Sequence, residues 1–167
     1  MTEKIYRSYL EIRSLDELKE VKKPSKNYFI ELADPKDFQL NKFFYKTIGK
    51  NCQWIDRLIW TDLNWIDYIS NDQLFTYILK DESEIAGYFE LLFNKQSKEA
   101  EIAYFGILEE YYGNKLGGYL LSEAIKSSFK MGGERVWVHT CSLDHENALK
   151  NYLARGMKNF KSETLIR

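Results

Sequence analysis

Two periodicities of hydrophobic positions divide the chain into predicted strands and helices. Apolar residues alternate with polar ones, or form short continuous runs, over seven segments typical of β-strands. These segments are 4–13, 27–32, 74–80, 85–93, 100–108, 135–140 and 158–167. Apolar positions follow a helical rhythm over 38–70, 116–131 and 143–157. Gly49 and Asn51 predict a break that divides the first of these into two helices.

The order of these segments predicts a mixed α/β fold. Two strands and two helices precede three consecutive strands, which the polar turns 81–84 and 95–100 join as an antiparallel meander. A helix, a strand, a helix and a last strand follow. A strand, a helix and a second strand in succession indicate a parallel pair beside the antiparallel sheet. The chain has only two prolines and no evident linker or repeat, so we expect 1–167 to form a single domain.

Composition narrows the classes of partner. Lys and Arg number 24 and Asp and Glu 25, so the formal net charge is −1, and neither nucleic acid nor a membrane is an expected partner. Cys52 and Cys141 are too few and too far apart in sequence for a disulfide framework or a zinc site, and we expect no metal. The charged first residues lack the apolar core of a signal peptide, and no later run is long enough to span a membrane. These features favour a cytoplasmic protein.

A glycine-rich stretch stands directly before the predicted helix 116–131. Residues 110–121 read EYYGNKLGGYLL and include Gly113, Gly117 and Gly118. A helix N-terminus presents unpaired N–H groups and partial positive charge, and glycines allow an anion to approach closely, so one interpretation is a phosphate site. The alternative is an ordinary helix start, because short glycine patterns often occur by chance.

From the meander to the last strand, about 85–167, the chain resembles the GCN5-related N-acetyltransferase superfamily. The family's pyrophosphate loop, Q/R-x-x-G-x-G/A, falls on 112–117, with Tyr112 in place of Gln or Arg and Lys115 in place of the first glycine. Lys115 would bring its own ammonium to the phosphates. The resemblance implies that this loop holds coenzyme A, through Tyr112, Gly113, Asn114, Lys115, Leu116, Gly117 and Gly118.

The last predicted helix carries a second part of the resemblance. The family commonly reads N-x-x-A-x-x-x-Y-x-x-x-G-F, and this chain has His145, Ala148, Tyr152, Gly156 and Met157 at those positions. The resemblance implies that His145 and Ala148 contact the cofactor and that Tyr152 donates a proton to the departing thiolate. His145 could instead be a capping or surface histidine, and Tyr152 a core residue.

The resemblance also implies a fold with a splayed parallel strand pair and a reaction. Backbone groups of Phe105, Gly106 and Ile107 would pair with the pantetheine arm of the cofactor. Glu101 stands where histone-type members carry their catalytic glutamate, so it is the first candidate for the base, with Glu90 in reserve. Solvation or pairing with a lysine would explain Glu101 equally well, and an edge-strand position would explain Glu90.

The aromatic helices between 38 and 70 would form the acceptor side of the site by the same resemblance. Tyr45, Trp54 and Arg57 are its candidate substrate-binding residues. Aromatic residues at helical spacing are more often core, and Arg57 with Asp56 could be a surface ion pair.

The implied function is transfer of an acetyl group from acetyl-CoA to a primary amine of a small molecule, peptide or protein, by a monomer or homodimer. The alternative is a catalytically silent coenzyme A-binding sensor or scaffold, which the departures at Tyr112 and Lys115 keep open. A nucleotide-binding domain is a weaker third reading, since no Walker-type Gly-Lys-Ser/Thr run exists.

Overall fold

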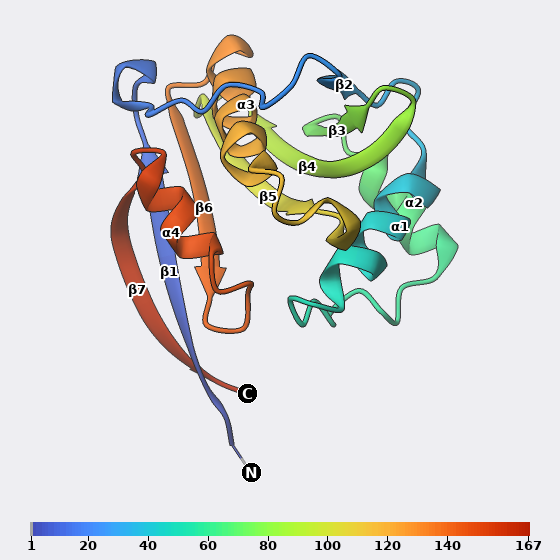
Figure 1. Ribbon diagram of the computed structural model, residues 1–167. Coiled ribbons are helices and arrows are strands. Elements are labelled where there is room, and N and C mark those ends of the chain that lie inside the picture. The colour runs from blue at the N-terminus through green and yellow to red at the C-terminus, as the bar shows by residue number, and fades with distance from the viewer. Residues whose placement is uncertain (1) are drawn as a thin grey trace.

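A computed structural model describes residues 2–167. The strands are β1 (Lys4–Ile12), β2 (Tyr28–Leu32), β3 (Leu74–Asp81), β4 (Glu84–Asn94), β5 (Glu99–Ile107), β6 (Arg135–Cys141) and β7 (Lys158–Ile166). The helices are α1 (Phe38–Gly49), α2 (Asp62–Ile69), α3 (Leu116–Lys130) and α4 (Ala148–Ala154), with short 3-10 turns η1 (Leu15–Glu17) and η2 (Glu109–Tyr111). Figure 1 shows their arrangement.

The strands form one seven-stranded sheet in the order β2-β3-β4-β5-β6-β1-β7. Every neighbouring pair is antiparallel except β5 and β6, which are parallel. This confirms the expected mixed sheet with a single parallel pair. The first strand lies between β6 and β7, at the far side of the sheet from β2, which follows it in sequence.

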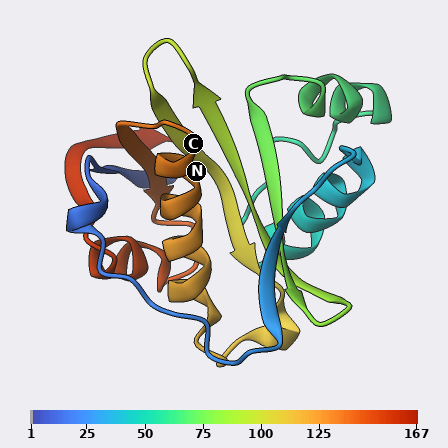
Figure 2. The same ribbon diagram turned by 90° about the horizontal axis from the view of Figure 1, so that it is seen from above.

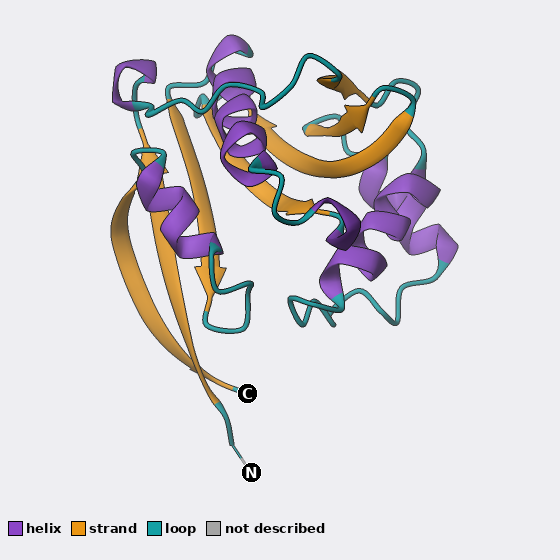
Figure 3. Ribbon diagram, in the orientation of Figure 1, coloured by secondary structure: helices purple, strands orange, loops and turns teal. Residues whose placement is uncertain are grey.

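The parallel pair is joined over a short distance only. Its ladder consists of Glu99 with Arg135, Ala100 with Val136 and Glu101 with Trp137. Beyond Glu101 the two strands diverge, as Figures 1 and 3 show for β5 and β6. Backbone groups of β5 that point away from β4 therefore have no strand partner over the rest of its length. The implied splay is confirmed.

Helices pack on both faces of the sheet (Figure 2). They do so because β4 and β5 present apolar side chains to each face. On one face, residues of α3 such as Leu120 and Ile125 pack with Phe89 and Ile102. On the other face, Phe44 of α1 packs with Tyr88, and their rings stack 4.5 Å apart. Tyr88 and Phe89 are adjacent in sequence, and successive side chains of a strand point to opposite faces of the sheet. One therefore packs in the core on the α1 side and the other in the core on the α3 side.

Three predicted boundaries differ from the structure. The second helix, expected to begin just after the break at Gly49 and Asn51, begins only at Asp62. The helix expected over 143–157 is confined to Ala148–Ala154. Its expected first turn is instead a connection in which Asp144 accepts hydrogen bonds from the Thr140 hydroxyl and the Cys141 N–H. The hairpin between β3 and β4 is also tighter than expected, with Glu82 at φ 54° in the connection.

Candidate active site

A cleft of about 1180 Å³ occupies the splay between β5 and β6. Its walls come from the end of α1 and the following connection, from β5, from the start of α3, and from β6 and α4. The predicted residues that line it are Tyr45, Trp54, Arg57, Glu101, Phe105, Gly106, Ile107, Tyr112, Gly113, Lys115, Leu116, Gly117, Gly118, His145, Ala148 and Tyr152. The fold thus brings together segments that are distant in sequence around one cavity.

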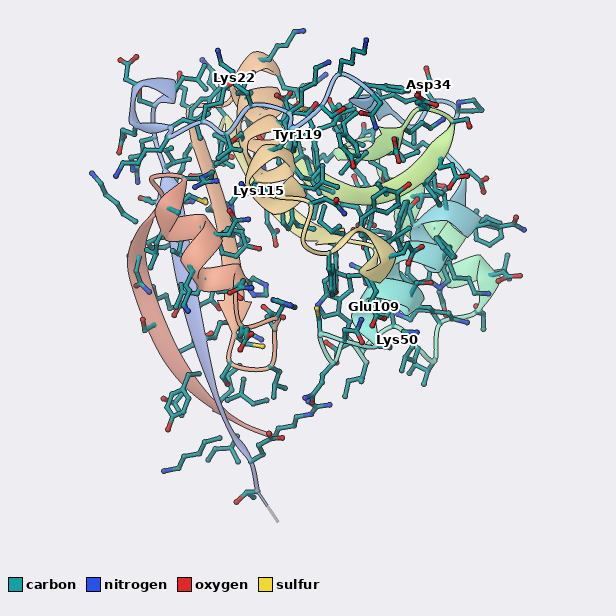
Figure 4. All side chains as sticks on the ribbon, viewed as in Figure 1. Lys22, Asp34, Lys50, Glu109, Lys115 and Tyr119 are labelled. Carbon is teal, nitrogen blue, oxygen red and sulfur yellow. The ribbon has the colours of Figure 1, made fainter. Side chains whose placement is uncertain are left out.

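The glycine-rich stretch forms one end of the cleft. Lys115 is the N-cap of α3, and no side chain caps the N–H groups of the first turn. Leu116, Gly117 and Gly118 of that turn line the cleft. Figure 4 places Lys115 at the start of the helix, one turn before Tyr119. Unpaired N–H groups at the start of a 15-residue helix can bind an anion.

The conformation of Lys115 explains why the family pattern has glycine at this position. Lys115 adopts the left-handed region, with φ 60° and ψ 28°, which costs a residue with a side chain about 1–2 kcal/mol. Gly113, at φ 83°, is the second left-handed residue of the loop. The loop therefore keeps a left-handed turn and adds a cationic side chain to it.

Helix α4 and the connection before it form the adjacent wall. Asn151 donates from Nδ2 to the Gly117 carbonyl over 3.1 Å and so ties α4 to the start of α3. His145 Nδ1 accepts a hydrogen bond from the Asn147 N–H over 3.1 Å. The His145 ring also meets the Tyr112 ring edge-on, with centroids 5.6 Å apart. Tyr112 and His145 thus touch across the cleft from opposite segments.

Tyr152 lies on the cleft side of α4. Its side chain is buried, and its ring lies 6.3 Å from that of Phe105 on β5. Within residues 2–167, no group forms a hydrogen bond with its hydroxyl. Burial raises the pKa of Tyr152, so the phenol is protonated at neutral pH. This places a proton donor against the splayed strand.

Glu101 is a half-buried carboxylate at the point where the splay begins. Its residue pair with Trp137 is the last of the parallel ladder, and its side chain lines the cleft. Burial raises the pKa of Glu101, and the nearby Arg57 charge opposes this. A carboxylate with a raised pKa is a better proton acceptor than an exposed one.

A β-bulge determines which side chains of β5 face each core. Glu90 pairs with Tyr104 and Leu91 with Ile102, so Ala103 is the extra residue. After the bulge Tyr104 packs against Trp54 on the α1 side, with ring centroids 4.9 Å apart, whereas Phe105 packs with Tyr152. The bulge therefore turns Tyr104 to the α1 side, and alternation places the next residue, Phe105, on the α3 side.

Arg57, in the connection between α1 and α2, lies in a cage of aromatic rings. Its guanidinium carbon is 4.1 Å from the ring centre of Tyr68, 4.3 Å from that of Tyr104 and 4.6 Å from that of Trp60. Cation–π contacts of this kind stabilise a cation that has been removed from water. The backbone N–H of Arg57 donates to the Tyr45 hydroxyl over 2.9 Å, which fixes the connection on α1.

Glu90 lies beneath this cage rather than in the cleft. It is fully buried. It accepts hydrogen bonds from the Tyr68 hydroxyl and from Asn41 Nδ2, the latter over 2.8 Å, and lies 3.9 Å from Arg57 Nη1. Burial raises its pKa, while these partners favour the charged form. The side chain thus connects α1, α2 and the Arg57 connection to the sheet.

Asn114 also lies away from the lining, and its Nδ2 donates to the Tyr111 carbonyl. Conversely, sequence reasoning missed Arg7, Tyr104, His139 and Asn151, all of which line the cleft. The alternation of 135–140 contained a signal for His139, since it places His139 on the same strand face as Trp137.

Residues 2–167 contain neither a metal site nor a membrane-spanning helix. No cluster of three or more His, Cys, Asp or Glu side chains suited to a metal ion occurs in this range. Nor does any helix in it have the length and apolar character needed to cross a membrane.

Comparison with solved structures gives the fold. The structure of a GCN5-related N-acetyltransferase from Sphaerobacter thermophilus matches with a TM-score of 0.71 and 15% identity, over 97% of this chain and 50% of that one. A functionally unknown conserved protein from Staphylococcus epidermidis matches with a TM-score of 0.66 and 16% identity, over 99% of this chain and 62% of that one. The chain thus spans only about half to two thirds of these two structures.

A third solved structure is of similar length to this chain. It is an aminoglycoside acetyltransferase from an uncultured soil metagenomic sample, in complex with sisomicin. It matches with a TM-score of 0.59 and 15% identity, over 77% of this chain and 86% of that one. No curated protein matches the sequence.

The family is shown by the sequence itself. The model of the acetyltransferase (GNAT) family matches residues 38–157, which run from the first residue of α1 to just beyond α4. This range includes the splayed strands, the uncapped start of α3 and most of the cleft wall. The chain therefore belongs to the GNAT acetyltransferase family.

Proposed function

We propose that the chain transfers an acetyl group from acetyl-CoA to a primary amine by direct attack of the amine. The observation that carries this proposal is the end of the β5–β6 ladder at Glu101 and Trp137, which opens a cleft between an anion-binding helix start and a half-buried carboxylate. Acetyl-CoA, when bound, supplies the acetyl group as a reactive thioester.

The residues present fit acetyl-CoA in three respects. The uncapped first turn of α3 and the Lys115 side chain suit the pyrophosphate. The backbone of Phe105, Gly106 and Ile107 has lost its β6 partner and can pair with the amide groups of the pantetheine arm. The cleft volume of about 1180 Å³ accommodates an extended cofactor and an acceptor together.

Glu101 and Tyr152 act at opposite stages of the reaction. An amine attacks only when neutral, and Glu101 takes a proton from the ammonium, directly or through water. Tyr152 donates from its hydroxyl to the sulfur as negative charge develops there. Glu90, the reserve candidate for the base, is fully buried outside the cleft, and its role in this proposal is to hold Arg57 and α2 in place.

The acceptor is a small-molecule amine or an amine of a peptide or protein. Trp54, Tyr45 and Arg57 line the same cleft as Glu101. Aromatic faces beside a carboxylate suit an ammonium group. Sisomicin, which the soil-metagenome acetyltransferase holds in its structure, is therefore included among the amines for testing.

The test is a screen of acetyl-CoA with polyamines, amino acids, peptides and sisomicin, followed by the release of free thiol. We expect release with at least one amine, and we expect coenzyme A to raise the melting temperature. Binding of coenzyme A without thiol release from any amine would instead support a silent sensor or scaffold. ATP competing with coenzyme A as an equal would favour a nucleotide-binding domain.

A further inference from the structure

His139 stands on the opposite wall of the cleft from Glu101. In the last pair of the parallel ladder, Glu101 is paired with Trp137, so their side chains share a sheet face. His139 lies two residues after Trp137 and is on that same face, with ring centroids 6.4 Å apart. His139 follows the last pair of the parallel ladder, so the splay separates it from β5. Both Glu101 and His139 line the cleft.

The surroundings hold the His139 ring but leave its nitrogens available. Tyr9 of β1 packs against the ring, with centroids 5.6 Å apart. No group within residues 2–167 forms a hydrogen bond with either ring nitrogen. His139 is exposed, with Tyr9 beside it, and its free ring nitrogens form an unused proton-accepting site.

The charged groups around His139 come from each neighbouring element. Arg7 on β1 disfavours the imidazolium, whereas Asp144 after β6 and Glu163 on β7 favour it. Glu163 is itself engaged, since it accepts a hydrogen bond from the Tyr9 hydroxyl over 2.5 Å and lies 3.5 Å from Arg7 Nη1. The largest influence is partial loss of water around the exposed ring, which lowers the pKa of His139. The ring is therefore neutral at neutral pH and able to accept a proton.

Acetylation of an ammonium group removes two protons from its nitrogen, whereas the Glu101 carboxylate can hold only one of them at a time. The nitrogen begins with three protons and ends as an amide with one, so it loses two. Attack forms the nitrogen–carbon bond, and expulsion of the sulfur breaks the carbon–sulfur bond. The sulfur gains a proton from Tyr152, and that phenol must be reprotonated. One of the two protons lost by the nitrogen restores the Tyr152 hydroxyl, and the second proton is released to solvent.

We propose that His139 is the second proton acceptor of the acetyl transfer, taking the proton that the nitrogen loses as the bond to carbon forms, while Glu101 takes the first. This inference rests on the proposed function. The amine nitrogen then lies between the two walls of the splay and donates one hydrogen bond to each. His139 returns its proton through the cleft to the Tyr152 oxygen or to solvent.

The first experiment compares the pH profile of kcat in the wild-type protein and His139→Gln, using the amine that is acetylated fastest. We expect a loss of about 100-fold in kcat, with KM for acetyl-CoA unchanged. The acid limb of the wild-type profile should combine the ionisations of Glu101 and His139, and the variant should lose the steeper, two-proton form of this limb and keep only the ionisation of Glu101. Phe160→Leu alters a ring that also packs on Tyr9 but does not line the cleft, and should keep the wild-type profile.

The second experiment does not depend on turnover. The chain has two histidines, His139 and His145, so their ring resonances can be assigned in NMR spectra with His139→Gln. Adding the same amine to the protein with coenzyme A should shift the His139 resonance. Full activity with an unchanged acid limb in His139→Gln, or no shift on adding amine, would overturn the assignment. A wild-type protein that acetylates no amine would instead refute the proposed function, and this inference with it.

Discussion

Glu101 and Trp137 form the last residue pair of the parallel ladder between β5 and β6, and the cleft begins directly beyond them. This pair fixes the carboxylate at the closed end of the splay, while Tyr152 lies farther along, against Phe105. The proton acceptor and the proton donor of the proposed reaction are therefore held by two rigid elements on different sides of one gap.

Replacing Glu101 with Gln preserves the size of the side chain but removes its ability to accept a proton. We expect kcat to fall by about 10²- to 10⁴-fold, with little change in acetyl-CoA affinity. Glu99→Gln is the matched control, because Glu99 lies two residues earlier on the same strand and does not line the cleft. Steady-state kinetics decides the matter, and an unchanged rate in Glu101→Gln would assign the first proton to water.

Tyr152→Phe removes only a hydroxyl. If that hydroxyl donates to the departing sulfur, kcat should fall by about 10²-fold while KM for acetyl-CoA stays nearly constant, which marks a contact made in the transition state. Tyr119→Phe is the control, since Tyr119 belongs to the same buried core but does not line the cleft. Equal rates for Tyr152→Phe and the wild type, per folded molecule, would make Tyr152 a packing residue.

Two substitutions at Lys115 separate its charge from its backbone conformation. Lys115→Ala and Lys115→Gly both remove the ammonium and should weaken coenzyme A binding. Only glycine relieves the left-handed conformation, so Lys115→Gly should be more stable than Lys115→Ala by about 1 kcal/mol. Calorimetric titration with coenzyme A and with pantetheine measures the first effect, and thermal unfolding the second.

Lys130→Ala, at the other end of α3, is the control for lost charge. If Lys115→Ala weakened pantetheine as much as coenzyme A, the ammonium would not contact phosphate. That result would leave the uncapped helix start alone as the anion site.

The raised pKa of Glu90 predicts that the free energy of unfolding depends on pH in an unusual way. Burial raises its pKa in the folded protein, so the folded state binds the proton more tightly than the unfolded state. The stability from this group is then fully present below the unfolded pKa of about 4.3 and is lost as pH rises through the folded pKa. Glu90→Gln lacks this dependence.

Urea unfolding of wild type and Glu90→Gln across pH measures the effect. The variant should be less stable by about 1–3 kcal/mol at the acidic end, because its amide mismatches the donors of Asn41 and Tyr68. The difference should shrink as pH rises. Glu84→Gln, at the exposed start of the same strand, should show no such trend, and a parallel trend in both variants would refute a raised Glu90 pKa.

Much of the fold could be predicted from local pattern. The meander 74–108 alternates clearly, and a helix between two strands predicts their parallel pairing. The position of β1 between β6 and β7 could not be predicted, since strand order depends on which edges remain unpaired in the folded sheet. The expected helix over 143–157 was too long because Asp144 hydrogen-bonds backward to the end of β6.

The candidate site was predictable where glycine or family spacing marked it, as at Gly117 and Ala148. The bulge at Ala103 carries no glycine or proline signal, so the position of Tyr104 on the α1 side of the sheet was missed. Glu90 was expected as the reserve base or as a charge on an edge strand, and its burial among partners was not predicted. The structure supplies those partners from Tyr68 and Asn41, which no local pattern connects to it.

The most direct test of the proposed acetyl transfer is the simultaneous measurement of free thiol and acetylated amine by mass spectrometry during one reaction with acetyl-CoA. The account predicts that the two products accumulate in equal amounts, that both depend on enzyme and amine, and that both slow together in Glu101→Gln. Thiol release without acetylated amine would show hydrolysis of the thioester, and that result, or no product with any amine despite bound coenzyme A, would contradict the account.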